Sequence, residues 1–344
     1  MPTLYITDQQ ATLRKTHNRL VVERDKVKLA EIHDFKVDRV VIFGNVQVTT
    51  QAVAFLLDRG IDTTFLSSRG KLKGRLAPLA SRNAFLRVRQ YERVRDVRFA
   101  AEVAGAIVSG KIDNCSLVLA RHQRNHPECE LQLELSLLAR LSVKAAEKPT
   151  IDALRGIEGQ AAAIYFKAFP RMLRRSMNFT KRTRRPPTDP INALLSFAYT
   201  LLYNEAIGAL VSVGFDPYLG FLHSLDYGRC SLALDLIEEL RAVVADRLVL
   251  NVTNLEVIKP GDFTGDASQG IQIKDAARRR FLNEYERLVT AEFPHRRTGE
   301  RMNFRRVLHD QALAMQRTVT QGEPYQPFQG WHEERGFWFL VSSG

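Results

Sequence analysis

The chain has 344 residues, and 45% of them are hydrophobic, which allows sizeable cores and excludes a disordered or fibrous protein. Fifty Lys and Arg residues against 38 Asp and Glu residues give a net charge of +12, so we expect nucleic acid as partner, with an anionic membrane surface as the second choice. The three cysteines form no disulfide or zinc pattern and residues 1–20 are polar, so we expect a cytoplasmic protein with no membrane span.

Short runs of alternating apolar residues occupy the first eighty residues and are typical of β-strands. We expect strands over residues 3–7, 18–23, 27–32, 39–43, 61–66 and 71–76, and one helix over residues 50–59. Gly44-Asn45 predicts a tight hairpin, because glycine supplies the positive φ of such turns, and the last two strands predict another. These elements indicate a small β-rich N-terminal domain over residues 1–80, which we expect to serve in packing or subunit contact.

From Ser81 onward the apolar period lengthens to about 3.6 residues, which is typical of helices. The first helical stretch carries an apolar stripe at Phe85, Val88, Tyr91, Val94 and Val97. Later in the chain, only residues 247–252 resemble a strand. The sequence therefore predicts an α+β protein, with a larger all-α C-terminal domain over residues 81–344.

The helical segment LRGIEGQAAAIYFKAF contains the first chemical signal. Glu158 lies between Gly156 and Gly159, each of which costs roughly 0.5–1 kcal/mol relative to alanine inside a helix. The glycines indicate a close approach to the backbone by another helix or by a phosphate. Helix packing would explain the glycines, but it does not explain the carboxylate.

A basic segment follows, over residues 171–190. Its seven cations precede any acidic residue: Arg171, Arg174, Arg175, Lys181, Arg182, Arg184 and Arg185. Three prolines indicate a loop, and a basic loop can neutralise phosphates along a nucleic-acid backbone. The alternative is a loop whose charges serve only solubility, although a run of one sign makes that alternative weaker.

The stretch GFLHSLDYGRCSLALDLIEELR, residues 220–241, groups four side chains of possible catalytic use. His223 lies just before a helix that is predicted to start at Ser231 as its N-cap. On that helix Asp235, Glu238 and Arg241 recur every three residues and share one side. A histidine with carboxylates suits Mg²⁺ or Mn²⁺. An acidic stripe exposed to solvent is the alternative, and the pattern alone leaves both open.

Four blocks in order give a more specific indication. They are LRGIEGQAAAIYFKAF, RRPPTDPINALLSFAYTLLYNEA, VGFDPYLGFLH and RCSLALDLIEELR. Together they resemble the CRISPR-associated protein 1 family, the integrase–endonuclease of spacer acquisition. The stretch KIDNCSLVLAR resembles the helix that precedes these blocks in the family. After YQPF, the end QGWHEERGFWFLVSSG matches no family pattern.

The resemblance implies a role for each matching residue. Glu158, His223 and Glu238 fall on the family's ligands for Mn²⁺ or Mg²⁺, and Asp235 falls on a carboxylate that supports this catalytic site. The basic segment supplies candidates for DNA binding, and Arg241, beside the predicted ligands, is a further candidate. These candidates are Arg174, Arg175, Lys181, Arg182, Arg184, Arg185 and Arg241, of which the last is equally able to serve as a salt bridge to Glu238.

The resemblance also implies an activity and partners. The expected enzyme is a metal-dependent DNA endonuclease and integrase that inserts spacers into a CRISPR array in antiviral defence. Its site would direct a DNA 3′-hydroxyl or water in line onto a phosphodiester. The family forms homodimers and assembles with CRISPR-associated protein 2 on double-stranded and branched DNA. Two alternatives stay open: a repair nuclease for branched DNA, and a DNA-binding scaffold without catalysis.

Overall fold

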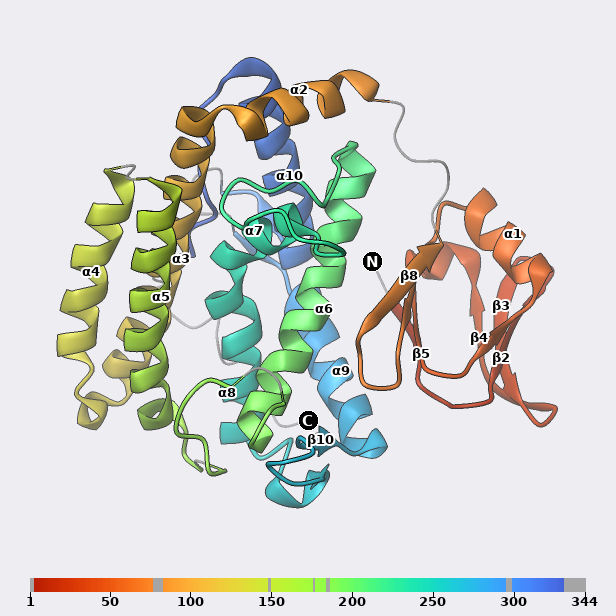
Figure 1. Ribbon diagram of the computed structural model, residues 1–344. Helices are drawn as coiled ribbons and strands as arrows, with labels where there is room; N and C mark the ends of the chain where they lie inside the picture. The colour runs from red at the N-terminus through yellow and green to blue at the C-terminus, as the bar shows by residue number, and fades with distance from the viewer. Residues whose placement is uncertain are drawn as a thin grey trace.

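The computed structural model describes residues 3–76, 83–147, 150–175, 177–183, 186–294 and 299–330. In this part of the chain, eight strands and one helix come first, and helices dominate the remainder (Figure 1). The predicted α+β class, with a β-rich start and a mostly helical C-terminal region, is confirmed.

The N-terminal strands form two four-stranded sheets. The first has the order β1-β5-β7-β8, with bounds Thr3–Ile6, Arg39–Phe43, Asp62–Leu66 and Leu72–Leu76. The second has the order β4-β3-β2-β6, with bounds Val27–His33, Arg19–Arg24, Thr12–Thr16 and Gln47–Val48. Strands β7 and β8 form the predicted antiparallel hairpin, whereas β1, β5 and β7 run parallel. Helix α1 spans Thr50–Asp58 and starts at its N-cap Thr49, whose side chain accepts from Ala52 N.

The predicted hairpin at Gly44-Asn45 is wrong. Strand β5 lies between β1 and β7, whereas β6 pairs in parallel with β2 in the other sheet. Gly44 has a φ of +74°, and an added Cβ would lie 2.3 Å from Gln9 Oε1. The glycine is therefore required where the chain passes from one sheet to the other. Strand β2 was not predicted.

The C-terminal region consists mainly of nine α-helices among the described residues. They are α2 (Ala84–Arg95), α3 (Val97–Asn125), α4 (Gln132–Ala146), α5 (Ile151–Ala168), α6 (Pro190–Val213), α7 (Ser231–Leu240), α8 (Arg247–Asn254), α9 (Asp275–Thr290) and α10 (Phe304–Gln321). A π-helical segment, Arg241–Asp246, joins α7 to α8, so the strand predicted over residues 247–252 is wrong. Short 3₁₀ turns cover Asp34–Lys36, Pro127–Cys129, Phe169–Met172 and Pro260–Asp262.

Two short antiparallel pairs interrupt the helical region. Strand β9 (Phe263–Thr264) pairs with β10 (Gln272–Ile273), and β11 (Phe293–Pro294) pairs with β12 (Arg301–Met302). Each strand has two residues, so the region is predominantly rather than purely helical. The proposed division between residues 80 and 81 falls outside the described residues and stays a prediction.

Helix α2 differs from its predicted amphipathic pattern. The side chains of Phe85 and Val88 are exposed, at 87% and 57%, whereas Leu86 and Gln90 are buried. Gln90 Nε2 donates to the carbonyls of Asp216 and Leu219, at 2.8 and 3.0 Å. The amide satisfies backbone groups of another segment, and so a polar residue takes the place expected for an apolar one.

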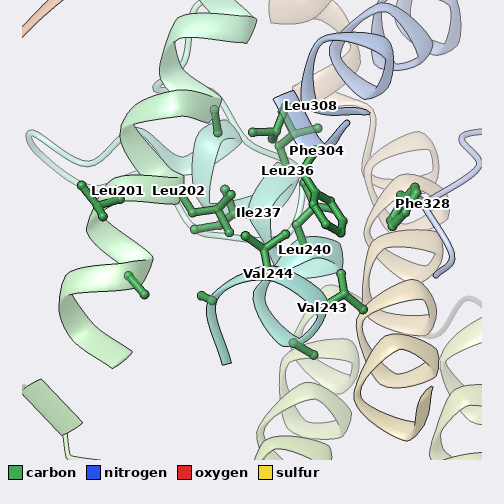
Figure 2. Close-up of a cluster of buried hydrophobic side chains, with 14 of the residues drawn as sticks. Leu201, Leu202, Leu236, Ile237, Leu240, Val243, Val244, Phe304, Leu308 and Phe328 are labelled. Atoms are coloured by element: carbon green, nitrogen blue, oxygen red, sulfur yellow. The ribbon is translucent and has the colours of Figure 1, made fainter. Parts of the chain in front are cut away.

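Helix α7 lies at the centre of the helical region. Figure 2 shows Leu236, Ile237 and Leu240 of α7 and Val243 and Val244 of the π-helical segment with the side chains of their neighbours. These neighbours are Leu201 and Leu202 of α6, Phe304 and Leu308 of α10, and Phe328 near the C-terminus. The polar residues of α7 are thus carried by a helix that is packed on all sides.

Helices α3 and α6 are long and apolar enough to cross a bilayer by length and composition alone. In each, 67% of the apolar window is buried inside the protein, as in the core helices of a globular protein. The pattern thus identifies them as central supports of the fold. Figure 1 shows α6 beside α7, and α3 lies against both α5 and α7.

Candidate active site

Two helices and one connecting loop carry the predicted residues, and a third helix supplies a cation that joins two of them. Glu158 lies on α5, Glu238 lies on α7, and His223 precedes α7 in the loop after α6. Lys111 of α3 contacts both glutamates: its ammonium Nζ pairs with Glu158 Oε1 and lies 2.6 Å from Glu238 Oε2. The two carboxylates are therefore within two ion-pair lengths of each other, although 80 positions separate them in the chain.

Asp235 fixes the loop that carries the histidine. This fully buried carboxylate accepts from the backbone N–H groups of Phe221 and Leu222 through Oδ2, at 2.6 and 3.0 Å. Its Oδ1 accepts from His223 N at 3.0 Å and lies 2.6 Å from His223 Nδ1. At Gly220, an added Cβ would lie 2.6 Å from Asp235 Oδ2, so only glycine allows this approach. Both oxygens of Asp235 are therefore occupied by the loop that carries His223.

The Asp235 contact determines which nitrogen of His223 is available. With Nδ1 held by the carboxylate, Nε2 faces the site and lies 3.8 Å from Glu238 Oε1. A carboxylate behind one ring nitrogen is the usual arrangement of a metal-ligating histidine, because it orients the ring and raises the basicity of the other nitrogen.

Glu238 is buried and charged. Burial by itself would raise the pKa of this carboxyl, but Arg241, Lys111 and His223 stabilise the charged form and hold the pKa at about 2. Arg241 Nη1 lies 3.0 Å from Glu238 Oε1. The Lys111 contact with Oε2 is an ion pair without hydrogen-bond alignment, so that oxygen accepts no hydrogen bond.

Glu158 differs from Glu238 in its exposure. A quarter of its side chain is exposed, whereas the side chain of Glu238 is 1% exposed. An added Cβ at Gly156 or Gly159 would meet no atom within 4 Å. Packing against another helix therefore does not explain these glycines, and the backbone beside Glu158 is open.

The donor set fits a divalent cation, although the side chains do not yet surround one point. Among the described residues, no three His, Cys, Asp or Glu side chains stand in a ligand arrangement, because the Lys111 ammonium lies between the two carboxylates. Glu238 Oε2 lacks a hydrogen bond, and His223 Nε2 faces the same carboxylate. Two carboxylates and one imidazole are ligands that Mn²⁺ accepts, and the oxygens suit Mg²⁺.

The prediction missed Lys111 and Glu239. Lys111 is the one cation between Arg98 and Arg121 in a long, mostly apolar helix, and a buried ammonium requires a partner, so this pattern was the available signal. Glu239, also buried, accepts from Tyr325 OH at 2.8 Å and from Phe328 N. Burial raises the pKa of Glu239 to about 7, against these hydrogen bonds. Its adjacency to Glu238 was the only sequence signal.

The predicted DNA-binding cations divide into two groups. Arg174 and Lys181 are exposed, and Arg175 is exposed beside Glu256, at 2.7 Å. The other group points inward and is engaged by protein groups. Arg182 donates to Asn192 Oδ1 and Ser196 Oγ, while Arg182 and Arg241 both lie on the Tyr199 ring, 5.3 and 4.9 Å from its centroid. Arg184 and Arg185 lie outside the described residues.

Comparison with known proteins identifies the family. The family model described as "CRISPR associated protein Cas1" matches residues 4–287. The chain belongs to the Cas1 family. It is 34% identical over 334 residues to the CRISPR-associated endonuclease Cas1 1 of Chlorobaculum tepidum, covering 95% of this chain and 97% of that protein. With CRISPR-associated endonuclease Cas1 3 of Thermus thermophilus the identity is 36% over 329 residues, covering 94% and 96%.

One relative is a longer protein. The Cas4/Cas1 fusion of Geobacter sulfurreducens is 38% identical over 333 residues, and this match covers 94% of the chain but only 59% of the fusion. Among solved structures, the Cas1 protein of Thermotoga maritima has a TM-score of 0.80 and 26% identity, covering 96% of this chain and all of that one. A casposase bound to an integration product has a TM-score of 0.84, but at 21% identity it shares the fold alone.

Proposed function

We propose that this Cas1 family member inserts spacers into a CRISPR array by metal-dependent attack on DNA phosphodiesters at Glu158, His223 and Glu238. The family relationship supports an endonuclease and integrase. The observation that carries the assignment is the convergence of two carboxylates on one cation beside an imidazole that a third carboxylate holds by Nδ1. Holding the His223 ring in this way is useful if Nε2 must bind a metal ion.

The reaction would divide among few groups. Glu158, His223 and Glu238 would hold Mg²⁺ or Mn²⁺, which supplies Lewis-acid stabilisation of the attacking and leaving oxygens of an in-line displacement. Asp235 keeps the His223 proton on Nδ1, and Arg241 keeps Glu238 ionised. The open backbone beside Glu158 supports the approach of a phosphodiester from that side. The attacking group would be a DNA 3′-hydroxyl in integration and water in cleavage.

The proposed partners follow the names of the structural neighbours. A Cas6-RT-Cas1–Cas2 complex matches with a TM-score of 0.79 and 26% identity, over 97% of this chain and 36% of that one. We assign CRISPR-associated protein 2 as a partner on this basis. Double-stranded and branched DNA are proposed as partners because integration joins a DNA end to a duplex. Homodimerisation through the N-terminal sheets is supported by Val27, Leu29 and Phe35, whose apolar side chains are exposed on and just after the edge strand β4.

An integration assay tests the proposal. The complete protein, the small partner protein and a plasmid bearing a repeat are incubated with a short duplex in Mn²⁺ or in EDTA. We expect strand transfer in Mn²⁺ only, and its loss in Glu158→Gln and His223→Ala. The control Glu92→Gln, at an exposed glutamate of α2, should retain it. Strand transfer that survives both site substitutions would place the chemistry elsewhere.

The same assay separates the alternatives. A repair nuclease would cleave branched DNA in Mn²⁺ without inserting ends into the repeat. A scaffold would bind DNA but leave every phosphodiester intact. The charge arrangement favours catalysis over a scaffold, because burying Glu238 and orienting His223 serve no evident purpose in binding a DNA backbone.

A further inference from the structure

Lys111 is the buried cation of the candidate site, and the proposed reaction leaves it without a task. Its side chain is 8% exposed and rises from an apolar part of α3, between Val108, Ile112 and Cys115. The ammonium contacts Glu158 Oε1 and Glu238 Oε2. These oxygens belong to the two carboxylates that a divalent ion would require.

Electrostatics explains why a cation is needed here. Two carboxylates this close repel each other unless a cation lies between them. Lys111 and Arg241 together balance the charges of Glu158 and Glu238, so these four groups sum to zero.

A divalent ion would change that balance. If Lys111 stayed in place, the ion would add two positive charges beside two cations and would have to share both oxygens with the ammonium. Lysine is suited to leave, because its charge sits on a flexible four-carbon stem and makes no bidentate contact. Arg241 is less free to move, since its guanidinium also lies against the Tyr199 ring.

We propose that Lys111 is a built-in counter-ion that competes with the divalent metal for Glu158 and Glu238. Metal loading then requires the ammonium to leave these oxygens, and the released charge is available to a DNA phosphate. The idea rests on the proposed metal site and deepens it. It follows that metal and DNA bind cooperatively, because the phosphates compensate the charge that the ion adds, and this coupling acts equally in both directions.

The main test measures metal binding without DNA or activity. Mn²⁺ is titrated calorimetrically into the full chain and into Lys111→Met, which keeps an unbranched side chain one atom shorter and removes the charge. We expect Lys111→Met to bind Mn²⁺ at least about tenfold more tightly, as the loss of one charge-assisted competitor implies. In EDTA, Lys111→Met should melt several degrees below the parent protein, and Mn²⁺ should restore its melting temperature. The melting temperature of the parent protein should differ little between EDTA and Mn²⁺. The control Lys144→Met, at an exposed lysine of α4, should match the parent.

Unchanged or weaker Mn²⁺ binding by Lys111→Met would overturn the proposal. A second measurement uses the unaltered protein, in case the variant fails to fold. Lysines are acetylated with a water-soluble ester in EDTA or in Mg²⁺, and the peptides are quantified by mass spectrometry. The Lys111 rate should rise several-fold in Mg²⁺ while the Lys144 rate stays constant, and a constant Lys111 rate would refute displacement. Neither readout depends on integration, so failure of the proposed function would be recognised separately.

Discussion

Replacing Asp235 with asparagine tests how the candidate site holds its imidazole. The carboxylate accepts from Phe221 N and Leu222 N at one oxygen, and from His223 N and Nδ1 at the other. Asparagine offers one acceptor oxygen in place of two, so its NH₂ group must face one of these donor pairs. Keeping the oxygen toward Phe221 and Leu222 preserves two backbone hydrogen bonds, which directs the NH₂ group toward His223.

The consequence for His223 can be worked out from this geometry. Its Nδ1 would accept from the NH₂ group, which places the ring proton on Nε2, toward Glu238. A protonated Nε2 cannot ligate a metal. The lost hydrogen bond from His223 N to a buried charged acceptor should lower the free energy of unfolding by about 1.5–3 kcal/mol. Metal affinity or strand transfer should fall about 10–100-fold, as for other partners of ligating histidines.

Three measurements check the Asp235→Asn prediction. Urea unfolding gives the stability change, Mn²⁺ titration gives the affinity change, and ¹⁵N chemical shifts of the His223 ring report the tautomer. The control Asp226→Asn lies in the adjacent loop, where its side chain is exposed beside Arg229, and should change each by little. If Asp235→Asn keeps the proton of His223 on Nδ1 and retains full metal affinity, the positioning role is refuted.

Three further predictions concern stability and DNA binding. Burial raises the pKa of Asp246 to about 6, above its ordinary 3.8, so the folded state holds this proton more tightly than the unfolded state does. The contribution of Asp246 to the free energy of unfolding should therefore fall by about 3 kcal/mol as pH rises from about 4 to 6. In urea titrations over this pH range, the difference between the parent protein and Asp246→Asn should change by that amount. Arg305→Ala removes the cation that lies 3.0 Å from buried Glu205 and leaves Arg39 at 3.2 Å, so it should cost about 1.5–3 kcal/mol in the same assay. The exposed Arg317→Ala should cost about 0.5 kcal/mol. Alanine at both Arg174 and Lys181 should lower the slope of log affinity for DNA against log salt by about 2, and an unchanged slope would assign both to solubility.

Local patterns predicted the N-terminal elements well but not their partners. The hairpin of β7 and β8 was predictable because a short turn joins neighbouring strands. Gly44-Asn45 carries a similar turn signal, yet β5 and β6 pair with different sheets, and such pairing depends on residues far away in the chain. The apolar pattern of α2 likewise cannot reveal that Gln90 forms hydrogen bonds with backbone groups near Asp216. These bonds bury the side of α2 that carries Gln90 and leave the predicted apolar stripe exposed.

The candidate site was predictable where several residues share a short segment. His223, Asp235 and Glu238 lie within sixteen positions, so a loop folding back onto one helix brings them together. The N-cap is nonetheless Cys230 rather than Ser231, whose hydroxyl donates to the carbonyl of Ser224 at 2.9 Å. Glu158 was assigned to the candidate site from the family resemblance, because the spacing of residues within a helix does not show which helices contact each other. Lys111 was missed for the same reason.

The segment from Tyr325 to Gly330 forms a strap near the C-terminus. It crosses α3 and α7, and Asn114 links these elements: its Nδ2 donates to the carbonyls of Glu239 and Phe328, at 2.7 and 2.8 Å. Gly330 N donates to Asn114 Oδ1 at 2.9 Å. The helix that carries Glu238 is thus held on one side by a strap, and the strap depends on close approach to α3.

Gly110 of α3 provides the test of that strap. An added Cβ would lie 2.5 Å from Pro327 Cβ, a clash that the rigid proline ring can relieve only by moving the strap. Gly110→Ala should therefore lose about 1–3 kcal/mol in urea unfolding, even though alanine favours a helix. Limited proteolysis should also become faster within residues 322–330. In Gly156→Ala the added Cβ meets nothing within 4 Å, so this control should gain up to about 1 kcal/mol. The expected loss of stability in Gly110→Ala comes from the clash with Pro327 alone. Equal gains in both variants would therefore show that the strap does not depend on a close approach to α3.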